Sequence, residues 1–234
     1  MAIQKTVSRE DWLAARLKLL EQEKALTGQR DAVSRARQEL PRVRIDKDYV
    51  FQGENGGETL SDLFAGRSQL IIYHFMFGPD WEEGCRSCSL IAEGFDGPDS
   101  HLAERDVTFL AASRGPLPKL LSFRDRMGWT FKWVSSLGSD FNRDFQVSFT
   151  EDEISGEVYY NYAKGKFPMT EAPGLSVFYK DPDGSIYHTY SCFARGLDAL
   201  IGTYQYLDLV PKGRDEDDLP FTMEWVRHHD RYED

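Results

Sequence analysis

The stretch "QLIIYHFMFGPDWEEGCRSCSL", residues 69–90, contains the two features that decide the fold and the candidate site. It begins with a nearly continuous apolar run, residues 69–77, which has the length of one strand. Such a run is typical of a central strand covered on both faces of a sheet. After a polar, turn-like segment, Cys85 and Cys88 follow three positions apart, where a helix can begin. The stretch therefore predicts a strand–helix unit with two thiols at its junction.

The flanking sequence predicts an α/β domain with a mixed sheet. A tight turn, "DPDG", joins residues 173–180 to 185–191, which is the pattern of an antiparallel hairpin. Strands that alternate with helices before such a hairpin indicate a mixed sheet with flanking helices. Further strands are expected at 42–52, 106–113, 131–136 and 156–162, and helices at 59–67, 85–95, 117–129, 138–147 and 194–210.

Residues 8–40 predict a helical arm in front of this domain. Ser8 is a suitable N-cap, and Gly28 is a possible break between two helices. The arm is interpreted as a surface helix that covers its own domain, with a homodimer contact as the alternative. Pro41 ends it.

Three parts are therefore expected along the chain. They are the arm at 1–41, an α/β domain at 42–210, and a charged tail at 211–234 that is draped over the surface.

Composition narrows the class of protein. Of the 234 residues, 41% are hydrophobic and 29% charged, the balance of a soluble globular protein. The net charge of −11 argues against nucleic acid and against an anionic membrane surface as partners. No apolar run approaches the roughly 20 residues that cross a bilayer, and the polar N-terminus lacks the features of a signal peptide. A cytoplasmic location is expected, where structural disulfides are uncommon.

The two thiols have the spacing of a redox pair. A cysteine reacts as its thiolate, and the start of a helix lowers the thiol pKa below about 8.5. Arg86 adds a positive charge beside Cys85, and the C-x-x-C spacing places Cys88 one turn further on. In a cytosolic chain this pattern indicates a catalytic or metal-binding pair more often than a structural disulfide.

Two other interpretations of the thiols remain open. The pair can be two bystander cysteines, since cysteine is often buried as a small hydrophobe. Alternatively, His188 and Cys192 complete a formal Cys₃His zinc set with Cys85 and Cys88. The zinc set is disfavoured because its two halves lie about 100 residues apart in a chain of 234. We expect no cofactor, and Cys192 is expected to be a partly buried free thiol.

Several of these stretches resemble known proteins. The strand, Trp81, the cysteine pair and Pro173 before "GLSVFYKDPDG" resemble the thioredoxin fold. The segments "EKALT", "KDYVF", "YHFMFGPDW", "GCRSCS", "RMGW", "WVSSLGSDFN" and "YHTYSCFARG" resemble the bacterial thioredoxin-like family called domain of unknown function 899. The resemblance implies a thioredoxin-like α/β fold, with Pro173 as a cis-proline against the dithiol. It implies no particular reaction, because the family has none established.

The sequence departs from two related patterns. Thioredoxin has tryptophan directly before its first cysteine, whereas this chain has Gly84 there and Trp81 four residues upstream. A peroxiredoxin requires proline seven residues, and threonine or serine three residues, before its reactive cysteine. Gly78 and Glu82 occupy those places before Cys85, so the peroxiredoxin motif is absent.

The sequence therefore predicts a thiol–disulfide oxidoreductase. Cys85 would attack a substrate disulfide, and Cys88 would resolve the mixed disulfide. Trp81 would wall the thiol, Arg86 would support the thiolate, and Pro173 would shape the substrate groove. The partner would be a disulfide-containing protein or a small thiol. The alternatives are a non-catalytic binding protein with the same fold and a zinc-stabilised module.

Overall fold

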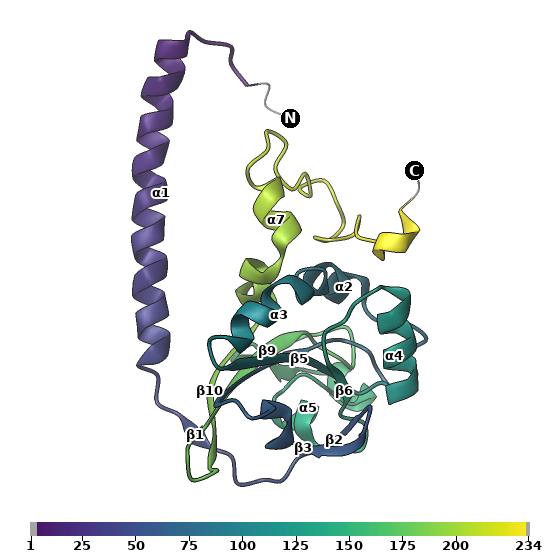
Figure 1. The fold of residues 1–234 in the computed structure, drawn as a ribbon. Coiled ribbons are helices and arrows are strands. Elements are labelled where there is room, and N and C mark those ends of the chain that lie inside the picture. The colour runs from purple at the N-terminus through teal and green to yellow at the C-terminus, as the bar shows by residue number, and fades with distance from the viewer. Residues whose placement is uncertain (1–3, 233–234) are drawn as a thin grey trace.

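The computed structural model describes residues 4–232 and places a mixed sheet between two layers of helices (Figure 1). A long N-terminal helix stands beside this domain (Figure 1). In chain order the elements are α1 (Arg9–Gln38), β1 (Val43–Arg44), β2 (Val50–Gly53), β3 (Gly56–Thr59), the 3₁₀ helix η1 (Asp62–Phe64), β4 (Gln69–His74), α2 (Arg86–Ala92), α3 (Asp96–Ala103), β5 (Val107–Ser113), α4 (Leu117–Arg126), β6 (Trp133–Ser135), α5 (Phe141–Asp144), α6 (Glu151–Ile154), β7 (Val158–Tyr160), β8 (Ala163–Gly165), β9 (Gly174–Lys180), β10 (Ile186–Phe193), the 3₁₀ helix η2 (Ala194–Leu200), α7 (Gly202–Leu207) and the 3₁₀ helix η3 (His229–Arg231).

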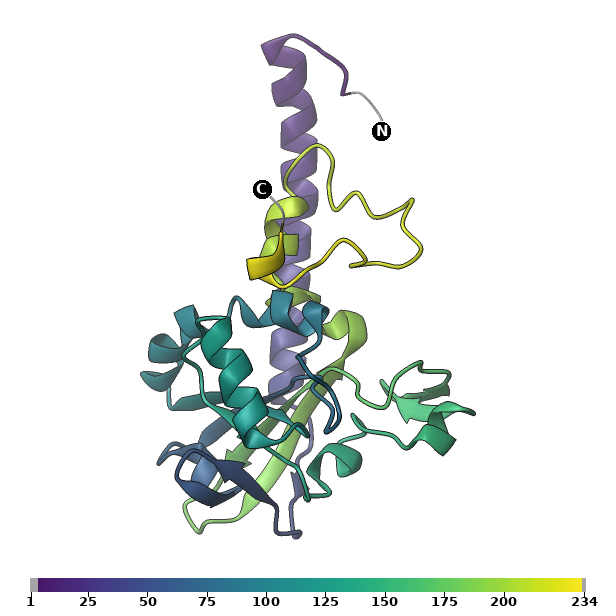
Figure 2. The same ribbon diagram turned by 90° about the vertical axis from the view of Figure 1, so that its right-hand side faces the viewer.

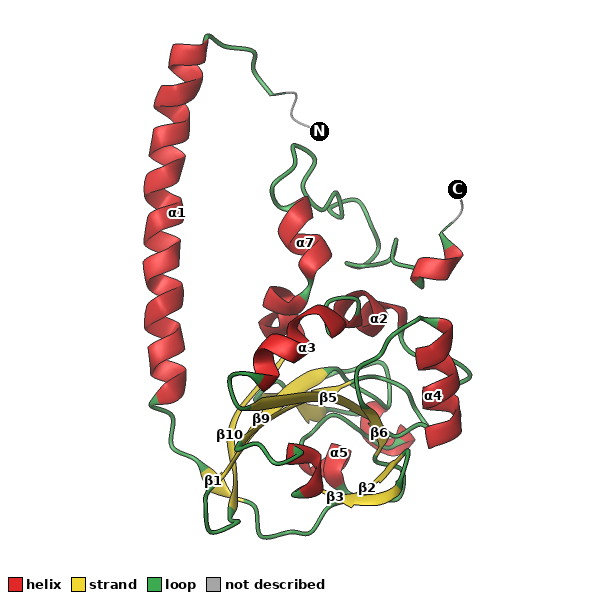
Figure 3. Cartoon of the chain, viewed as in Figure 1, coloured by secondary structure: helices red, strands yellow, loops and turns green. Residues whose placement is uncertain are grey.

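The main sheet has the strand order β1-β10-β9-β4-β5-β6-β2-β3 (Figure 3). Strands β4, β5 and β6 are parallel, β9 runs antiparallel to β4, and β10 runs antiparallel to β9. The set β10-β9-β4-β5, with helices between the parallel pair and a hairpin at its edge, is the arrangement of the thioredoxin fold. The predicted fold class is confirmed, and the predicted central strand lies at the centre of the sheet.

Alternating side chains of β4 divide the interior into two cores. Tyr73 faces the helices α2, α3 and α4, whereas Leu70 and Ile72 face η1 and α5. We call these the upper and lower cores, after their positions in Figure 1. The upper core contains Tyr73, Phe75, Phe77, Cys88, Ile91, Phe95, Leu120, Phe123, Trp129 and Trp133. The lower core contains Phe51, Phe64, Leu70, Ile72, Leu110, Phe141, Phe145 and Phe178.

The segment 42–52 does not form the single strand that its alternation predicts. It forms β1 and β2, which lie on opposite sides of the sheet: β1 pairs with β10, whereas β2 pairs with β3 and β6. The polar residues between the two strands cross beneath the sheet, where Lys47 pairs with Asp140 and Asp144 of the α5 region at 2.8 and 2.7 Å. Because the segment is interrupted, its first part pairs with β10 at one side of the sheet and its second part pairs with β3 and β6 at the other.

Helix α1 is a single helix, and Gly28 does not break it. Ser8 is its N-cap, as predicted, and its hydroxyl accepts a hydrogen bond from the Asp11 backbone N–H at 3.0 Å. One glycine inside a helix costs about 1 kcal/mol, which good helix formers on both sides offset. None of the residues Arg9–Gln38 is buried. The expectation that this helix covers its own domain is therefore wrong (Figures 1 and 2).

The charged chain after α7 returns to the domain, and part of it is buried there. It rises beyond α7 and then descends toward α2 and α4 (Figures 1 and 2). Val226 and His228 are buried, with 0% and 5% of their surface exposed. We call residues 208–232 the C-terminal strap. Within residues 4–232, no helix is both long enough and apolar enough to span a membrane.

Candidate functional site

Cys85 lies where the sequence predicts it, at the junction between the central strand and α2. Its backbone N–H donates to the Met76 carbonyl oxygen at 3.0 Å, just beyond the end of β4. Its own carbonyl oxygen accepts from the Ser89 N–H at 2.9 Å and the Ser89 hydroxyl at 3.0 Å. Cys85 is the N-cap residue of α2, and the helix begins at Arg86. These bonds fix the thiol between a buried strand and the positive end of a helix.

Gly84 occupies the place where thioredoxin has tryptophan, and the local packing requires a glycine there. A Cβ atom at Gly84 would lie 2.6 Å from Cε1 of Phe75 and 2.9 Å from Cε1 of Phe123. Both rings belong to the upper core, so neither can move freely. The backbone before Cys85 can therefore lie against the aromatic core only without a side chain.

The two thiols have opposite electrostatic environments. Cys85 is partly exposed, and its pKa is lowered to about 6. The largest cause of the lowered pKa is a hydrogen bond from the Cys88 thiol, which outweighs the opposing effect of burial. The thiolate is also favoured by the backbone N–H groups of Ser87 and Cys88 and by the charge of Arg86. Cys88 is 1% exposed, and burial raises its pKa well above the usual value. Both cysteines are reduced. The pair therefore consists of a thiolate near the surface and a buried neutral thiol beneath it.

Tyr73 provides a buried hydroxyl beside the inner thiol. Its side chain is fully buried, and the hydroxyl has no nitrogen or oxygen partner among residues 4–232. The neighbour of this hydroxyl is Cys88, whose pKa it lowers in opposition to burial. An unpaired buried hydroxyl is costly, and a thiolate at Cys88 would give it an acceptor. This residue was not among the predicted site residues, because nothing in the sequence distinguishes it from other core tyrosines.

Cys85 and Cys88 open into a cavity of about 290 Å³. Its walls come from α2, from the start of β9, from η2 and α7, and from the C-terminal strap. Most of its wall is apolar, and the charged side chains in the wall come from η2 and the strap. The lining residues are Met76, Cys85, Ser87, Cys88, Ile91, Pro173, Ala194, Arg195, Leu197, Asp198, Ile201, Tyr204, Arg214, Glu216, Thr222 and Met223.

The other predicted site residues lie at different distances from this cavity. Pro173 lines it together with both cysteines. Arg86 does not line it but acts on the Cys85 thiol by charge, and its guanidinium carbon lies 5.9 Å from the ring of Phe221 in the strap. Trp81 packs at the margin of the upper core and is not among the lining residues.

The peptide bond before Pro173 is trans, since residues 4–232 contain no cis peptide bond. The cis-proline implied by the resemblance is therefore wrong for this structure. The carbonyl oxygen of Pro173 accepts a hydrogen bond from the Tyr160 hydroxyl at 2.7 Å, and that hydroxyl accepts from the Ala194 N–H at 3.1 Å. The β7–β8 hairpin, which projects from the domain in Figure 2, thus fixes the proline through Tyr160.

The four residues of the alternative zinc set are not brought together. His188 faces the lower core, where its ring packs against Phe145 and Phe178, whereas Cys85 and Cys88 belong to the upper core. Across the described part of the chain, no three His, Cys, Asp or Glu side chains are arranged to hold a metal ion. Cys192 is a partly exposed free thiol that lines a different, open groove along β10.

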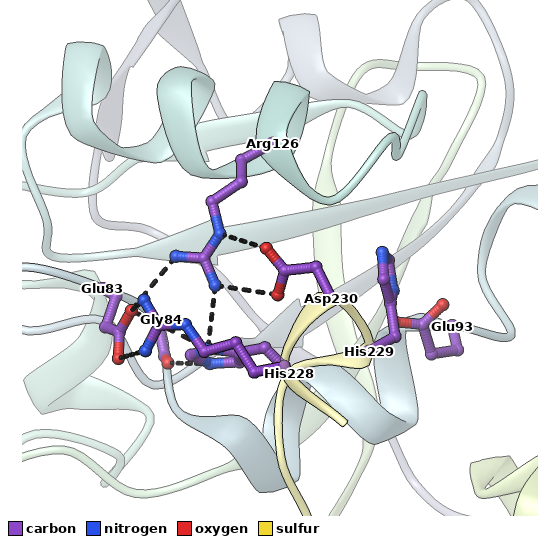
Figure 4. A network of polar contacts seen from close by, with 8 residues as sticks. Glu83, Gly84, Glu93, Arg126, His228, His229 and Asp230 are labelled. Carbon is purple, nitrogen blue, oxygen red and sulfur yellow. Dashed lines mark hydrogen bonds and ion pairs between the residues drawn. The ribbon is translucent and has the colours of Figure 1, made fainter. Parts of the chain in front are cut away.

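Sequence reasoning missed the network that fastens the strap to the loop before Cys85 (Figure 4). We call this network the clasp; its members are Glu83, Gly84, Arg126, His228, Asp230 and Arg231. Arg126 binds Asp230 through two hydrogen bonds of 2.8 and 3.1 Å and contacts Glu83 at 3.1 Å. His228 Nε2 lies 2.9 Å from the carbonyl oxygen of Gly84. The apolar and aromatic residues at 221–226 were the available signal that this charged tail packs onto the domain.

A second missed group is a buried carboxylate in the segment that leads into β9. Glu171 is 1% exposed, and burial raises its pKa to about 7, against the opposing effects of Ser148 and Arg114. The Ser148 hydroxyl donates to one carboxylate oxygen at 2.6 Å, and Arg114 donates to the other at 2.9 Å. Glu171 lies two residues before Pro173. Its hydrogen bonds therefore help to hold the start of β9 beside the cavity that both thiols line.

A family model described as "Bacterial protein of unknown function (DUF899)" matches residues 1–232. The chain belongs to the DUF899 family. No curated protein matches its sequence. The resemblance noted from the sequence motifs is therefore confirmed for almost the whole chain.

The DUF899 chain is also similar in structure to several solved proteins. Peroxidoxin BcpB from Mycobacterium tuberculosis aligns at 13% identity and a TM-score of 0.47, over 71% of this chain and 97% of that one. Peroxiredoxin Q from Xanthomonas campestris aligns at 18% and 0.43, over 72% and 95%. A putative thiol:disulfide interchange protein DsbE from Chlorobium tepidum aligns at 14% and 0.39, over 69% and 94%. At these levels of similarity, the activities of those proteins are not transferred to this chain.

Proposed function

We propose that this DUF899 protein is a thiol–disulfide oxidoreductase in which Cys85 is the nucleophile and Cys88 the resolving thiol. The observation that carries the proposal is the asymmetry of the pair: a partly exposed thiol of lowered pKa lies above a buried thiol of raised pKa. A dithiol enzyme needs this difference, because one sulfur must react with substrate while the other waits as a protected thiol.

The reaction would proceed in two exchanges. The Cys85 thiolate attacks one sulfur of a substrate disulfide, forms a mixed disulfide, and expels the other half as a thiolate that takes up a proton. The Cys88 thiol then loses its proton and attacks the Cys85 sulfur. This step forms the Cys85–Cys88 disulfide and releases the second half of the substrate as a thiol. The protein loses two electrons and the substrate gains two, so a further dithiol must reduce the protein for another turnover.

The surroundings of the pair support each exchange. The start of α2 and Arg86 favour the thiolate at Cys85 in the first. In the second, the buried Tyr73 hydroxyl can donate to the thiolate that forms at Cys88. The cavity beside both sulfurs offers space for the leaving group.

The test is the redox midpoint of the pair. Metal-free protein is equilibrated in graded dithiothreitol buffers and alkylated, and the modified thiols are counted by mass. We expect a reversible two-electron transition between about −120 and −270 mV, the range of working dithiol proteins. The absence of a reversible transition would contradict the proposal.

Three serine variants assign the roles of the thiols. Cys85→Ser is expected to abolish disulfide reduction, and Cys88→Ser to stop the reaction at a mixed disulfide that mass spectrometry detects. Cys192→Ser is the matched control, because Cys192 is a free thiol outside the cavity. Reduction that survives in Cys85→Ser would show that Cys85 is not the nucleophile.

A further inference from the structure

We propose that the dithiol acts on small, uncharged disulfides with apolar substituents and excludes protein disulfides. The inference rests on the proposed function and adds the substrate class. It follows from the C-terminal strap, which forms one wall of the cavity that contains both sulfurs.

The strap places side chains beside the thiols. Thr222 and Met223 line the same cavity as Cys85 and Cys88. The resulting space of about 290 Å³ lies at the small end of ligand pockets, which begin near 300 Å³. A protein substrate must instead lay a segment across an open surface, since even small protein–protein interfaces bury on the order of 1,000 Å². With the strap in place, a small molecule fits beside Cys85 and a folded protein surface does not.

One anchor fastens the strap beside the cavity through Glu216. Its Oε1 atom accepts hydrogen bonds from the Tyr204 hydroxyl at 2.7 Å, the Trp225 indole N–H at 2.6 Å and the Met223 backbone N–H at 3.0 Å. Tyr204 belongs to α7, so this carboxylate joins the strap to the helix that precedes it. Charge-assisted bonds of this kind are the stronger hydrogen bonds in proteins. The anchor holds Met223 against the cavity.

The clasp is the second anchor, and it fastens the far end of the strap to the loop before Cys85. Arg126 forms its paired bonds with Asp230, and Arg231 pairs with Glu83 at 2.8 Å. The buried His228 contacts Gly84, the residue next to the nucleophile. Single exposed ion pairs contribute little, but this network combines several with a buried hydrogen bond. The strap is therefore fixed on both sides of Met223.

The side chains of the cavity wall favour an apolar substrate. Met76, Ile91, Leu197, Ile201 and Met223 give it an apolar surface, and the thioether side chains can adapt to different shapes.

The charged side chains of the wall already have partners. Arg214 forms two bonds of 2.8 Å with Asp208, and Arg195 pairs with Asp198 at 2.7 Å. Glu216 is occupied by its three donors. A charged substrate would have to displace one of these pairs, whereas an uncharged apolar disulfide would not.

The experiment compares oxidants of the pre-reduced protein. The probes are 2,2′-dithiodipyridine as a small neutral disulfide, oxidised glutathione as a small charged one, and insulin as a protein disulfide. Each second-order rate is divided by the rate of free dithiothreitol with the same probe. We expect this ratio to fall from the neutral probe to oxidised glutathione to insulin. The ratio for insulin should be lower than that for the neutral probe by about 100-fold or more, which corresponds to about 2.7 kcal/mol.

Opening the strap should relax this selection. Met223→Gly and Glu216→Ala are expected to raise the insulin rate, relative to the rate with the neutral probe, by about tenfold. Leu209→Ala is the matched control, because Leu209 lies in the strap, is 82% exposed and does not line the cavity. Circular dichroism and the melting temperature verify that each variant is folded.

The outcomes separate the two proposals. A protein that has a redox midpoint but reduces insulin as readily as the neutral disulfide would overturn the substrate class alone. Variants that are folded and leave the insulin rate unchanged would also overturn it. A protein with no midpoint and no reaction with any probe would overturn the proposed function itself.

Helix α1 has a repeating pattern of exposed apolar side chains. Four of its large apolar side chains recur every seven residues, each between 39% and 53% exposed; they are Trp12, Leu19, Leu26 and Val33, whereas Leu13 and Leu17 lie outside this repeat. The positions three residues after each of them are also uncharged; they are Ala15, Gln22, Gln29 and Ala36. A seven-residue apolar repeat is the seam of a left-handed coiled coil. We infer that α1 pairs in parallel and in register with α1 of a second copy.

The flanking charges favour the parallel arrangement. In a parallel pair, Asp11 lies opposite Arg16 of the partner subunit, and Lys18 lies opposite Glu23 of the partner subunit. An antiparallel pair centred on the same helix would instead place Glu23 opposite Glu23 of the partner subunit and Arg16 opposite Arg30 of the partner subunit. The first arrangement makes two attractive contacts on each side, and the second repeats like charges.

The test uses light scattering and a cysteine cross-link. We expect a dimer at micromolar concentration, and a monomer for Leu19→Asp combined with Leu26→Asp. In a background with the three native cysteines changed to serine, Leu26→Cys should form an interchain disulfide, and Leu17→Cys, on the opposite face of the helix, should not. A monomeric wild type, or equal cross-linking at the two positions, would overturn this pairing.

Discussion

His228 Nε2 lies 2.9 Å from the carbonyl oxygen of Gly84, although the two residues are 144 positions apart in the chain. The carbonyl can only accept, so Nε2 carries the ring proton and donates it. The other ring nitrogen, Nδ1, lies 3.1 Å from the Arg126 guanidinium, which can only donate. The two neighbours therefore favour the arrangement in which Nε2 is the donor to Gly84. Through this ring the last residues of the chain contact the backbone next to the nucleophile.

The first prediction concerns this hydrogen bond. His228→Ala leaves the buried Gly84 carbonyl without its donor, so we expect the free energy of unfolding to fall by about 1–3 kcal/mol. We also expect bulky maleimides to label Cys85 faster, because the strap loses its contact with the loop. Urea unfolding and labelling rates measure the two effects. His228→Gln, which can return an N–H to the same carbonyl, should recover part of both; identical behaviour of the two variants would contradict the role of this bond.

The second prediction concerns the pH dependence of Cys85. With a pKa of about 6, alkylation of Cys85 by iodoacetamide should reach half its maximal rate near pH 6 and fall below it, where the thiol is protonated. Cys88→Ala removes the largest stabilising hydrogen bond and is expected to shift the midpoint upward by about one unit or more. Arg86→Ala should shift it upward by less, because the arginine charge is the smallest of the causes.

Cys192 is an internal comparison for this experiment. Burial raises its pKa, so in the same protein it should label only in more alkaline solution. Peptide mapping separates the two cysteines. A wild-type midpoint near 8.5 for Cys85, the value of a free cysteine, would show that the start of α2 does not activate it.

The local parts of the site could be predicted from the sequence, and the distant parts could not. The apolar run 69–77 and the C-x-x-C spacing are short-range patterns, and they predicted the central strand and the start of α2. The contact between His228 and Gly84 depends on how the whole chain folds back, and no local pattern encodes it. The same reason explains why Glu216 and Met223 were not expected beside the thiols.

The structure also differs from the prediction where a run of alternating apolar and polar residues is compatible with more than one arrangement of strands. Residues 42–52 alternate like one strand, but the sheet uses them as two short strands, β1 at one edge and β2 between β6 and β3, because polar residues lie between them. The Gly84 position was read from the sequence only as a departure from thioredoxin. Its physical reason, the close approach to Phe75 and Phe123, is visible only once the core is assembled.

The third prediction separates the two exchanges of the proposed reaction. Tyr73→Phe removes a hydroxyl that can donate to a thiolate at Cys88 and that lowers the pKa of this thiol against the effect of burial. Attack by Cys85 should be unchanged, whereas resolution by Cys88 should slow by about tenfold or more, since a hydrogen bond to a charged group contributes about 1.5–3 kcal/mol. Mass spectrometry of acid-quenched samples would then show a longer-lived mixed disulfide. Tyr206→Phe, at a residue 75% exposed, is the control.

A mixed disulfide that resolves at the wild-type rate in Tyr73→Phe would assign Tyr73 to packing alone. The stability of the reduced variant is expected to be equal to or above that of the wild type, because the hydroxyl is buried without a nitrogen or oxygen partner among residues 4–232.

The last prediction concerns Glu171 and the stability of the protein against pH. Burial raises the pKa of this carboxyl from 4.5 to about 7, so between these values the folded state holds a proton that the unfolded state has lost. The folded state binds more protons in this window, and the free energy of unfolding contributed by Glu171 therefore falls as the pH rises from about 4.5 to about 7. At 1.36 kcal/mol per pKa unit, the rise from 4.5 to about 7 corresponds to a loss of about 3 kcal/mol.

Glu171→Gln keeps a hydrogen-bond acceptor for Ser148 but cannot ionise, so it should lack this part of the pH dependence. Urea unfolding at pH 5 and pH 7.5 measures the free energy of unfolding of both proteins. From the lower to the higher pH, the free energy of unfolding of the variant should rise relative to that of the wild type by about 1–3 kcal/mol. Glu157→Gln, at an exposed glutamate, is the control and should follow the wild type at both values. A variant that loses stability relative to the wild type at pH 7.5 would show instead that the ion pair between Glu171 and Arg114 outweighs the cost of burying the carboxylate.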